Sequence, residues 1–203
     1  MDATTPLNTA LIIFVRHPKL GQVKTRLASV IGDEKALKVY QLLLEHTKNI
    51  TAELNCRKFV YYSEQVEEYD LWNSPGYTKR QQTGNDLGER MLNAFKELFE
   101  QGFKNIIIIG SDCYQLKNTM IKEAFELLDS CEVVIGPTFD GGYYLLGMNH
   151  LIPNLFYDKA WSTDHVFEKT LQDLELLNLQ FAKLQQLHDV DVVADLELNG
   201  IEI

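Results

Sequence analysis

Short runs of apolar residues alternate along this chain with longer segments in which apolar residues recur every three or four positions. Four of the short runs consist mainly of β-branched and other bulky apolar side chains: Leu11–Val15, Phe59–Tyr62, Asn105–Gly110 and Glu132–Gly136. Runs of this kind are typical of strands buried on both faces, as in a parallel sheet. A further strand is predicted over Tyr143–Met148, after an Asp-Gly-Gly turn.

The longer segments have the periodicity of amphipathic helices. They cover Lys35–Leu54, Leu87–Phe99, Asn118–Leu128 and Val166–Leu177. Gly102 is placed to end the second helix, and Ser162, Thr163 or Asp164 to cap the last one. Because strands and helices alternate without a Pro-, Gly- or Ser-rich linker, we expect one α/β domain over residues 1–203 with a mostly parallel sheet. Ligands of such sheets bind beyond the carboxyl ends of the strands.

The charge balance excludes some classes of partner. The 203 residues include 19 basic and 29 acidic side chains, for a net charge of −10. An acidic surface repels nucleic acids and anionic lipids, so a phosphate site must be a local basic cluster or use a bridging cation. The three cysteines fit no metal or disulfide pattern. Met1–Thr9 has no basic targeting signal and no run is long enough to span a membrane, so we expect a cytoplasmic protein.

A basic loop follows the first predicted strand. Arg16, Lys19, Lys24 and Arg26 lie within eleven residues, with Gly21 among them. Guanidinium and ammonium groups at the ligand edge of the sheet favour a phosphate or pyrophosphate site over a solvated loop that only balances charge. The loop matches neither of the common glycine-rich phosphate motifs, GxxxxGK[ST] and GxGxxG.

A second polar loop opens the helix that begins at Leu87. Asp86 has the position of an N-cap, and Glu89 completes a capping box three residues later. That local role is a strong alternative to ligand binding. Gly84 and Gly88 could instead allow the close approach of a flat ring such as a nucleobase.

Carboxylates follow the later strands. Asp112 comes after Ile106–Ile109 and could hold Mg²⁺ or Mn²⁺, or cap the helix near Lys117. Asp140 precedes a glycine pair that forms either a tight turn or an uncrowded acceptor site. The tail contributes Asp189, Asp191 and Asp195; some of these could complete a cation site, and at least one is expected to cap the last helix.

Several motifs in a fixed order resemble one bacterial family. They are Phe-x-Arg-x-Pro-x-x-Gly-x-Val-Lys-Thr-Arg-Leu, Asp-Leu-Gly-Glu-Arg-Met, Gly-Ser-Asp-Cys, Gly-Pro-x-x-Asp-Gly-Gly-Tyr-Tyr, Trp-Ser-Thr and Asp-Val-Asp. From Leu11 to Leu196 the chain is similar to the radical-SAM/selenodomain-associated transferase 1 family. The resemblance implies a single-domain, Rossmann-like GT-A fold, as in nucleotide-diphospho-sugar transferases and small nucleotidyltransferases.

The resemblance also implies roles for individual residues. The nucleotide would be held by its diphosphate and its base: Arg16, Gly21, Lys24, Arg26, Gln82, Gly84, Asp86 and Gly88. The sugar or acceptor side would be lined by Gly141, Gly142, Tyr143, Trp161 and Ser162. Asp112 and Asp191 would share a divalent cation, Mg²⁺ or Mn²⁺. The chain departs from the pattern at Tyr114, at Val192 and Val193, and in having one acid where a DxD motif has two.

Three hypotheses remain open at this point. The first is a metal-assisted glycosyltransferase that uses a nucleotide-sugar donor and a small-molecule acceptor, with Asp112 catalytic through its cation and Asp140 as general base. The second is a nucleotidyltransferase that joins a nucleoside triphosphate to a phosphorylated small molecule and releases pyrophosphate. The third is a nucleotide-binding protein without catalysis. None of the three involves a nucleic acid or a transmembrane segment.

Overall fold

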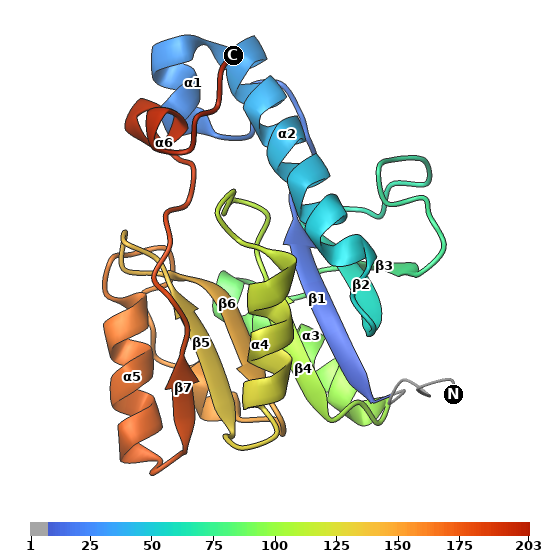
Figure 1. The fold of residues 1–203 in the computed structure, drawn as a ribbon, viewed down its shortest axis with the longest axis vertical. Helices are drawn as coiled ribbons and strands as arrows, with labels where there is room; N and C mark the ends of the chain where they lie inside the picture. Colours follow the sequence, from blue (N-terminus) through green and yellow to red (C-terminus); the bar gives the residue numbers. More distant parts are fainter. Residues whose placement is uncertain (1–7) are drawn as a thin grey trace.

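A twisted seven-stranded sheet forms the centre of the computed structural model, which describes residues 8–203 (Figure 1). Residues 1–7 of the expected domain lie outside the described part, as does most of the Met1–Thr9 segment. The strand order is β3-β2-β1-β4-β6-β5-β7. The strands are β1 (Thr9–Val15), β2 (Arg57–Tyr62), β3 (Tyr77–Gln81), β4 (Asn105–Ile109), β5 (Val133–Pro137), β6 (Tyr143–Met148) and β7 (Phe181–Lys183).

All neighbouring strands pair in parallel except at β6, which runs antiparallel to both β4 and β5. The Asp-Gly-Gly turn explains this exception, because it reverses the chain between β5 and β6 as a hairpin. The carboxyl ends of the parallel strands therefore meet at one edge of the sheet, with the β5–β6 turn beside them. This confirms the expected single α/β domain with a mostly parallel sheet.

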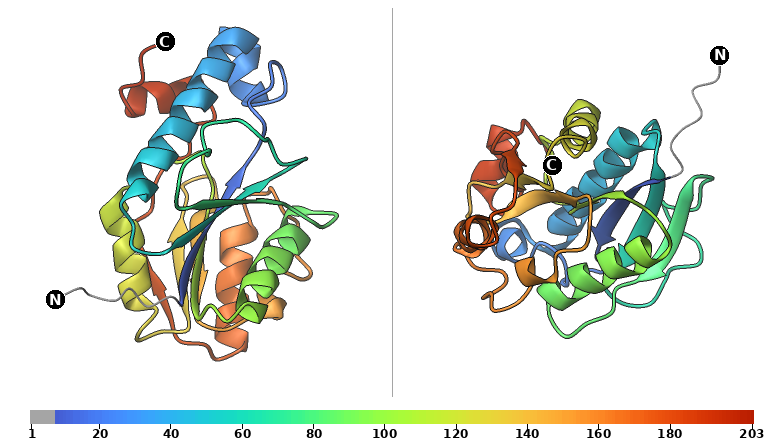
Figure 2. Two further views of the ribbon diagram at one scale, coloured as in Figure 1. Left: turned by 90° about the vertical axis from the view of Figure 1, so that its right-hand side faces the viewer. Right: turned by 90° about the horizontal axis from the view of Figure 1, so that it is seen from below.

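Helices cover both faces of the sheet (Figure 2). They are α1 (Thr25–Ile31), α2 (Asp33–Ala52), α3 (Leu87–Glu100), α4 (Asn118–Leu127), α5 (Val166–Leu176) and α6 (Val193–Leu198), with a 3-10 turn at Pro153–Leu155. Leu11 and Ile13 of β1 face the core that α2 and α4 cover, and Ala10 and Ile12 face the core that α3 covers. Alternate residues of a strand point to opposite faces, so a continuously apolar strand fills both cores.

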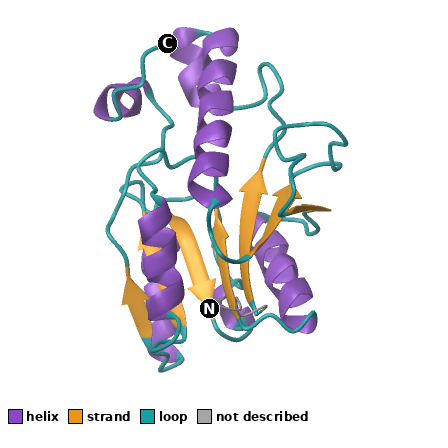
Figure 3. Ribbon diagram, turned by 45° about the vertical axis from the view of Figure 1, so that its right-hand side comes forward, coloured by secondary structure: helices purple, strands orange, loops and turns teal. Residues whose placement is uncertain are grey.

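A third, smaller core lies beyond the carboxyl ends of the strands. Leu27 of α1, Val39 and Leu43 of α2, and Val190 and Leu196 of the tail pack together there. This packing holds α1 and α6 side by side above the sheet (Figures 1 and 3). The basic loop and the acidic tail are thereby brought to the same edge.

Two expectations about helix ends are wrong. Helix α5 begins after His165 and has no side-chain cap, so Ser162, Thr163 and Asp164 do not cap it. Helix α4 begins after Lys117, also without a side-chain cap, so Asp112 is left available for other contacts. No helix in residues 8–203 is long and apolar enough to cross a membrane.

Candidate functional site

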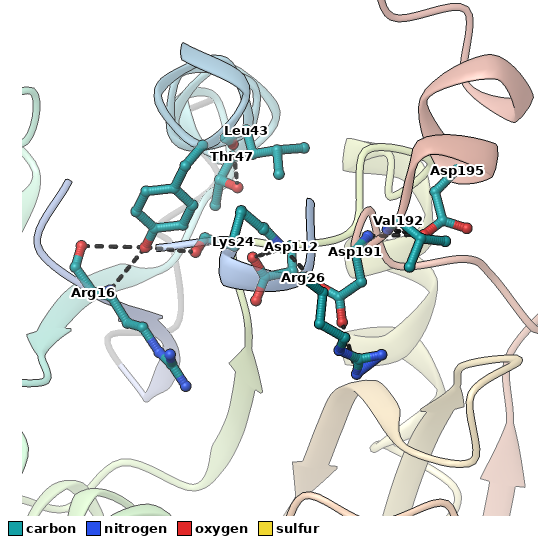
Figure 4. A network of polar contacts seen from close by, with 11 residues as sticks. Arg16, Lys24, Arg26, Leu43, Thr47, Asp112, Asp191, Val192 and Asp195 are labelled. Carbon is teal, nitrogen blue, oxygen red and sulfur yellow. Dashed lines mark hydrogen bonds and ion pairs between the residues drawn. The ribbon is translucent and has the colours of Figure 1, made fainter. Parts of the chain in front are cut away.

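Lys24 lies between two carboxylates at the carboxyl edge of the sheet (Figure 4). Its ammonium nitrogen is 2.5 Å from Asp112 Oδ1 and 3.0 Å from Asp191 Oδ1. The Lys24 side chain is only 4% exposed, whereas those of Asp112 and Asp191 are 45% and 36% exposed. One buried cation therefore joins the loop after β1, the loop after β4 and the tail.

The backbone holds this arrangement in place. Val190 N–H donates to the Asp112 carbonyl over 2.9 Å, which fixes the tail against the loop after β4. The Asp195 carboxylate accepts from the N–H groups of Asp191 and Val192, both at 2.8 Å. Asp195 is thus the tail acid that satisfies the helix start, as the sequence suggested for one of the three. Asp191 is left free to face Lys24.

Lys24 has a left-handed backbone, with φ 49° and ψ 45°, at the start of α1. Left-handed conformations are uncommon for residues other than glycine and mark positions where the surroundings over-determine the backbone. Burial alone would lower the pKa of the Lys24 ammonium, but attraction to Asp112 and Asp191 outweighs it and raises the pKa. Lys24 is therefore a permanent positive charge at neutral pH.

Arg26 provides a second cation on the solvent side. Its guanidinium is 3.5 Å from Asp191 Oδ2, and its side chain is 70% exposed. An exposed guanidinium beside a buried ammonium gives an incoming phosphate a first contact and then a second, deeper positive charge.

Asp189 is the tail acid to which the family resemblance gave no role. Its Oδ1 atom is buried and has no hydrogen-bond partner among the described residues. Burial raises the pKa of Asp189 to about 8, and the charges of Asp112, Asp140 and Asp191 add to the increase while Lys24 opposes it. The alternating Asp-Val-Asp sequence was the available signal, because residues two apart in an extended segment point to the same side.

Asp140 belongs to the turn between β5 and β6. Its Oδ1 accepts from the Thr138 hydroxyl at 2.5 Å and from Gly142 N–H at 3.1 Å. Gly141 has φ 88°, and a Cβ there would lie 2.0 Å from the Asp164 carbonyl oxygen. The turn is therefore locked by both glycines, and the exposed Asp140 carboxylate has a fixed orientation.

Each residue of the loop before α3 that was predicted to contact the nucleobase also has a local structural role. Gln82 donates through its side-chain amide to Tyr61 O at 2.9 Å, and Asp86 caps α3 by accepting from Glu89 N–H at 2.9 Å. A Cβ at Gly84 would lie 2.8 Å from the Arg90 nitrogen. The capping-box expectation is confirmed, while base recognition by this loop stays a prediction.

Trp161 lies directly on α3. A Cβ at Gly88 would be 2.1 Å from Trp161 Nε1, so the indole occupies the space that a side chain would fill. Tyr143 carries a buried hydroxyl without a hydrogen-bond partner in residues 8–203, and Ser162 is exposed with φ 63°. Tyr143 and Trp161 pack against the core that α3 covers, and no hydrogen bond or ion pair joins Tyr143, Trp161 or Ser162 to Lys24 within residues 8–203.

Arg16 is separate from the other predicted phosphate ligands. Its backbone N–H and carbonyl bond the Tyr40 hydroxyl at 2.8 and 3.1 Å, and that hydroxyl lies 3.4 Å from Ser111 Oγ. Burial raises the pKa of Tyr40 to about 12, so it stays a neutral hydrogen-bonding group. The guanidinium of Arg16 makes no drawn contact with Lys24, Asp112 or Asp191 (Figure 4). Tyr40 on α2 was not singled out from the sequence, because its helical spacing is also that of a core residue.

The donor set at this edge fits a small, hard cation. Asp112 and Asp191 converge on one point, which Lys24 Nζ now takes, and Mg²⁺ is commonly bound by one or two carboxylates plus substrate phosphates. Within residues 8–203 there is no group of three or more His, Cys, Asp or Glu side chains placed to hold a metal ion. A cation here would need phosphate oxygens and water to complete its ligand shell.

Comparisons with known proteins agree with this fold. The sequence model of a family described as "Uncharacterized protein conserved in bacteria (DUF2064)" matches residues 46–163. The structure resembles that of a "putative nucleotide-diphospho-sugar transferase" from Desulfovibrio desulfuricans G20, with 31% identity, a TM-score of 0.87 and coverage of 94% of this chain and 85% of that one. A comparison with curated proteins finds no match.

More distant structures share the fold alone. One is the CMP:2-keto-3-deoxy-manno-octonic acid synthetase complexed with CTP, at 9% identity and TM-score 0.58, covering 96% of this chain and 98% of that one. Another is 4-diphosphocytidyl-2C-methyl-D-erythritol synthase from Anaerococcus prevotii DSM 20548, at 11% identity and TM-score 0.60, covering 94% and 93%.

Proposed function

Since the chain belongs to the DUF2064 family and shares its fold with nucleotide-diphospho-sugar transferases and cytidylyltransferases, we propose that it is a transferase with a nucleotide-activated donor. The first candidate donor is a nucleotide-sugar, which agrees with the description of the relative at 31% identity. The motifs that resemble the radical-SAM/selenodomain-associated transferase 1 family support the same class.

One observation carries the proposal: Lys24 and Arg26 meet Asp112 and Asp191 at the ligand edge of the sheet. In a protein of net charge −10, two cations converge where parallel strands end. The donor diphosphate would bind to Lys24 and Arg26. Their charges would offset the negative charge that grows on the departing diphosphate.

Asp112 and Asp191 would hold a divalent cation, Mg²⁺ or Mn²⁺, together with the donor phosphates. Such a cation acts as a Lewis acid on phosphate oxygens. Because Lys24 contacts the same two carboxylate oxygens, its ammonium has to move before both acids can bind a metal. The released ammonium would then be free for a phosphate oxygen, while Arg26 keeps the phosphate oriented.

The acceptor would approach over the turn between β5 and β6. Asp140 is the proposed general base, because its Oδ1 is held by Thr138 and Gly142 and its other oxygen can take a proton from an acceptor hydroxyl. Gly141, Gly142, Tyr143, Trp161 and Ser162 remain the proposed acceptor side. Gln82, Gly84, Asp86 and Gly88 remain the proposed neighbours of the base, through backbone contacts and ring packing.

The first experiment is thermal denaturation with UDP, GDP, CDP and ADP and their diphospho-sugars, with and without Mg²⁺. A ligand at a hundred times its Kd stabilises the fold by about 2.7 kcal/mol, or roughly 5–11 °C for a chain of this size. Arg26→Met should weaken the binding of the active nucleotide by about 10- to 100-fold, as expected for a lost charge-assisted hydrogen bond. Lys38→Met removes an exposed cation of α2 and should leave binding unchanged.

The released product separates the candidate reactions. Release of a nucleoside diphosphate on addition of an acceptor supports glycosyl transfer, whereas release of pyrophosphate from a triphosphate supports nucleotidyl transfer. An Asp140→Asn variant that binds donor normally but turns over at the wild-type rate would exclude Asp140 as the base. Binding without turnover supports the non-catalytic hypothesis, and no binding of any nucleotide refutes the proposal.

A further inference from the structure

A pocket lies beside the loop that follows β1, on the side of the sheet that α2 covers. Its volume is about 230 Å³. It is bounded by the ends of β1 and β2, by Leu44 of α2 and by the segment that joins β2 to β3, which projects beside α2 (Figure 1). None of Lys24, Arg26, Asp112 and Asp191 lines it. We call it the His17 pocket; its lining residues are Val15, Arg16, His17, Pro18, Lys19, Leu44, Tyr62, Glu67, Tyr69, Asp70, Leu71 and Trp72.

A buried histidine without a hydrogen bond lines this pocket. The His17 side chain is 2% exposed, and neither ring nitrogen has a hydrogen-bond partner among the described residues. Nε2 lies 3.4 Å from Glu67 Oε1 without hydrogen-bond geometry, and Nδ1 has no hydrogen-bond partner in residues 8–203. Buried polar groups that lack a partner are destabilising, and each one requires an explanation.

Most other polar groups of the pocket already have partners. The Tyr62 hydroxyl donates to Asp70 Oδ2 at 2.5 Å, and Trp72 N–H donates to Asp70 Oδ1 at 3.0 Å. Lys19 is paired with Glu64 at 2.6 Å. In contrast, the Arg16 guanidinium makes no hydrogen bond or ion pair with any described residue. The groups left over are therefore the Arg16 guanidinium, the His17 imidazole and the half-exposed Glu67 carboxylate, whose nearest partner is His17 Nε2 at 3.4 Å.

The walls are apolar and largely aromatic. Tyr62 and Trp72, each 2% exposed, line the pocket together with the exposed Tyr69. Ligand pockets for drug-sized molecules occupy about 300–1,000 Å³, so this smaller volume is suited to a single ring. A planar carboxylate matches the forked donors of a guanidinium.

We propose that the His17 pocket binds a small, single-ring aromatic carboxylate, with the ring between Tyr62 and Trp72 and the carboxylate on Arg16 and His17. This site is independent of the proposed donor site. The ring replaces water against the aromatic side chains, and the carboxylate provides an aligned hydrogen-bond acceptor, which neither His17 nitrogen has among the described residues.

Three probes of nearly equal size test the charge of the ligand: benzoate, benzamide and benzylamine. The chain has two tryptophans, so Trp161→Phe leaves Trp72 as a fluorescent reporter in the pocket wall. Benzoate should change the Trp72 emission with saturation at a Kd of roughly 1 mM, the range expected for so few atoms. Benzamide should bind at least tenfold more weakly. Stronger binding of benzylamine, or no saturable change with any probe, overturns the proposal.

Matched variants test the two polar contacts. Arg16→Met should weaken benzoate binding at least tenfold, whereas Arg57→Met, at the opposite end of β2, should change it less than twofold. His17→Phe keeps the ring shape and removes both nitrogens, so it should weaken benzoate binding without lowering the melting temperature. A wild-type affinity in both pocket variants overturns the proposal.

A competition experiment between benzoate and the nucleotide distinguishes this site from the donor site. If the nucleotide that stabilises the protein does not displace benzoate, the two sites are separate, as proposed. Competitive displacement of benzoate by that nucleotide would make the pocket part of the donor site and overturn the inference. Failure to find any active nucleotide would refute the proposed function but leave this test intact.

Discussion

Lys24→Met tests the electrostatic centre of the candidate site directly. Methionine keeps most of the volume of the buried stem but removes the ammonium that joins Asp112 and Asp191. Breaking a fully buried ion pair costs about 3–5 kcal/mol, but these carboxylates are 45% and 36% exposed and regain hydration. We therefore expect a loss of about 2 kcal/mol, or roughly 4–8 °C in melting temperature.

The assay is thermal denaturation of wild type and variant in a chelator and at increasing Mg²⁺. Without Lys24, the two carboxylates face each other with only Arg26 nearby, so a divalent cation gains a site that the ammonium no longer blocks. Mg²⁺ alone should stabilise Lys24→Met more than it stabilises wild type. Lys38→Met, which removes an exposed cation elsewhere, serves as the control for net charge.

Two results would refute this reasoning. A Lys24→Met protein within about 0.5 kcal/mol of wild type would show that the ammonium contributes no more than an ordinary surface charge. Equal stabilisation of both proteins by Mg²⁺ would show that metal and ammonium do not compete for the same oxygens.

Three further substitutions test other parts of the structure. In the presence of a chelator, Asp189→Asn should raise the melting temperature at pH 7 but not below pH 4. The Asp189 carboxyl has a raised pKa in the folded state, so it destabilises the fold increasingly as the pH rises from its unfolded pKa toward 8. Equal effects at both pH values would contradict this. Gly88→Ala should displace Trp161, shift its fluorescence and lower the free energy of unfolding by about 1–3 kcal/mol, because the added Cβ would lie 2.1 Å from Trp161 Nε1. An unchanged emission spectrum would argue against the contact. Asp195→Ala should lower the free energy of unfolding by about 1 kcal/mol and increase amide exchange at Val192, whose N–H donates to the Asp195 carboxylate. Unchanged protection of that amide would exclude the cap.

The apolar strands were predictable because each one is a continuous run of apolar residues in the sequence. The continuous runs at Leu11–Val15 and Asn105–Gly110 became β1 and β4, and both lie buried at the centre of the sheet. Strand β3 was missed because its sequence, Tyr-Thr-Lys-Arg-Gln, is that of an exposed edge strand with only one strand neighbour. Its position depends on pairing with β2, which a local pattern does not contain.

The sequence singled out several residues that the structure brings together at this edge, but not the contacts between them. The basic loop and Asp112 were singled out because they follow predicted strands, whose carboxyl ends meet at one edge of a parallel sheet, whereas Asp191 came from the acidic tail and the family resemblance. That Lys24 would contact both acids, rather than remain free for a phosphate, depends on the small core formed by Leu27, Val190 and Leu196. That core joins segments more than 160 positions apart, and no local sequence feature specifies it.

Tertiary contacts also divide the basic loop into two groups of different chemistry. Tyr40 holds the Arg16 backbone close to β1, so Arg16 and His17 stay with the aromatic pocket. After Gly21 the chain turns through the left-handed Lys24 into α1, which directs Lys24 and Arg26 toward the acids of the tail. A loop that the sequence predicts to form one phosphate site therefore directs its cations toward the two separate sites proposed above. The separate variants Arg16→Met and Arg26→Met are consequently the decisive pair, because a single shared site would make their effects on nucleotide binding alike, whereas two sites make them different.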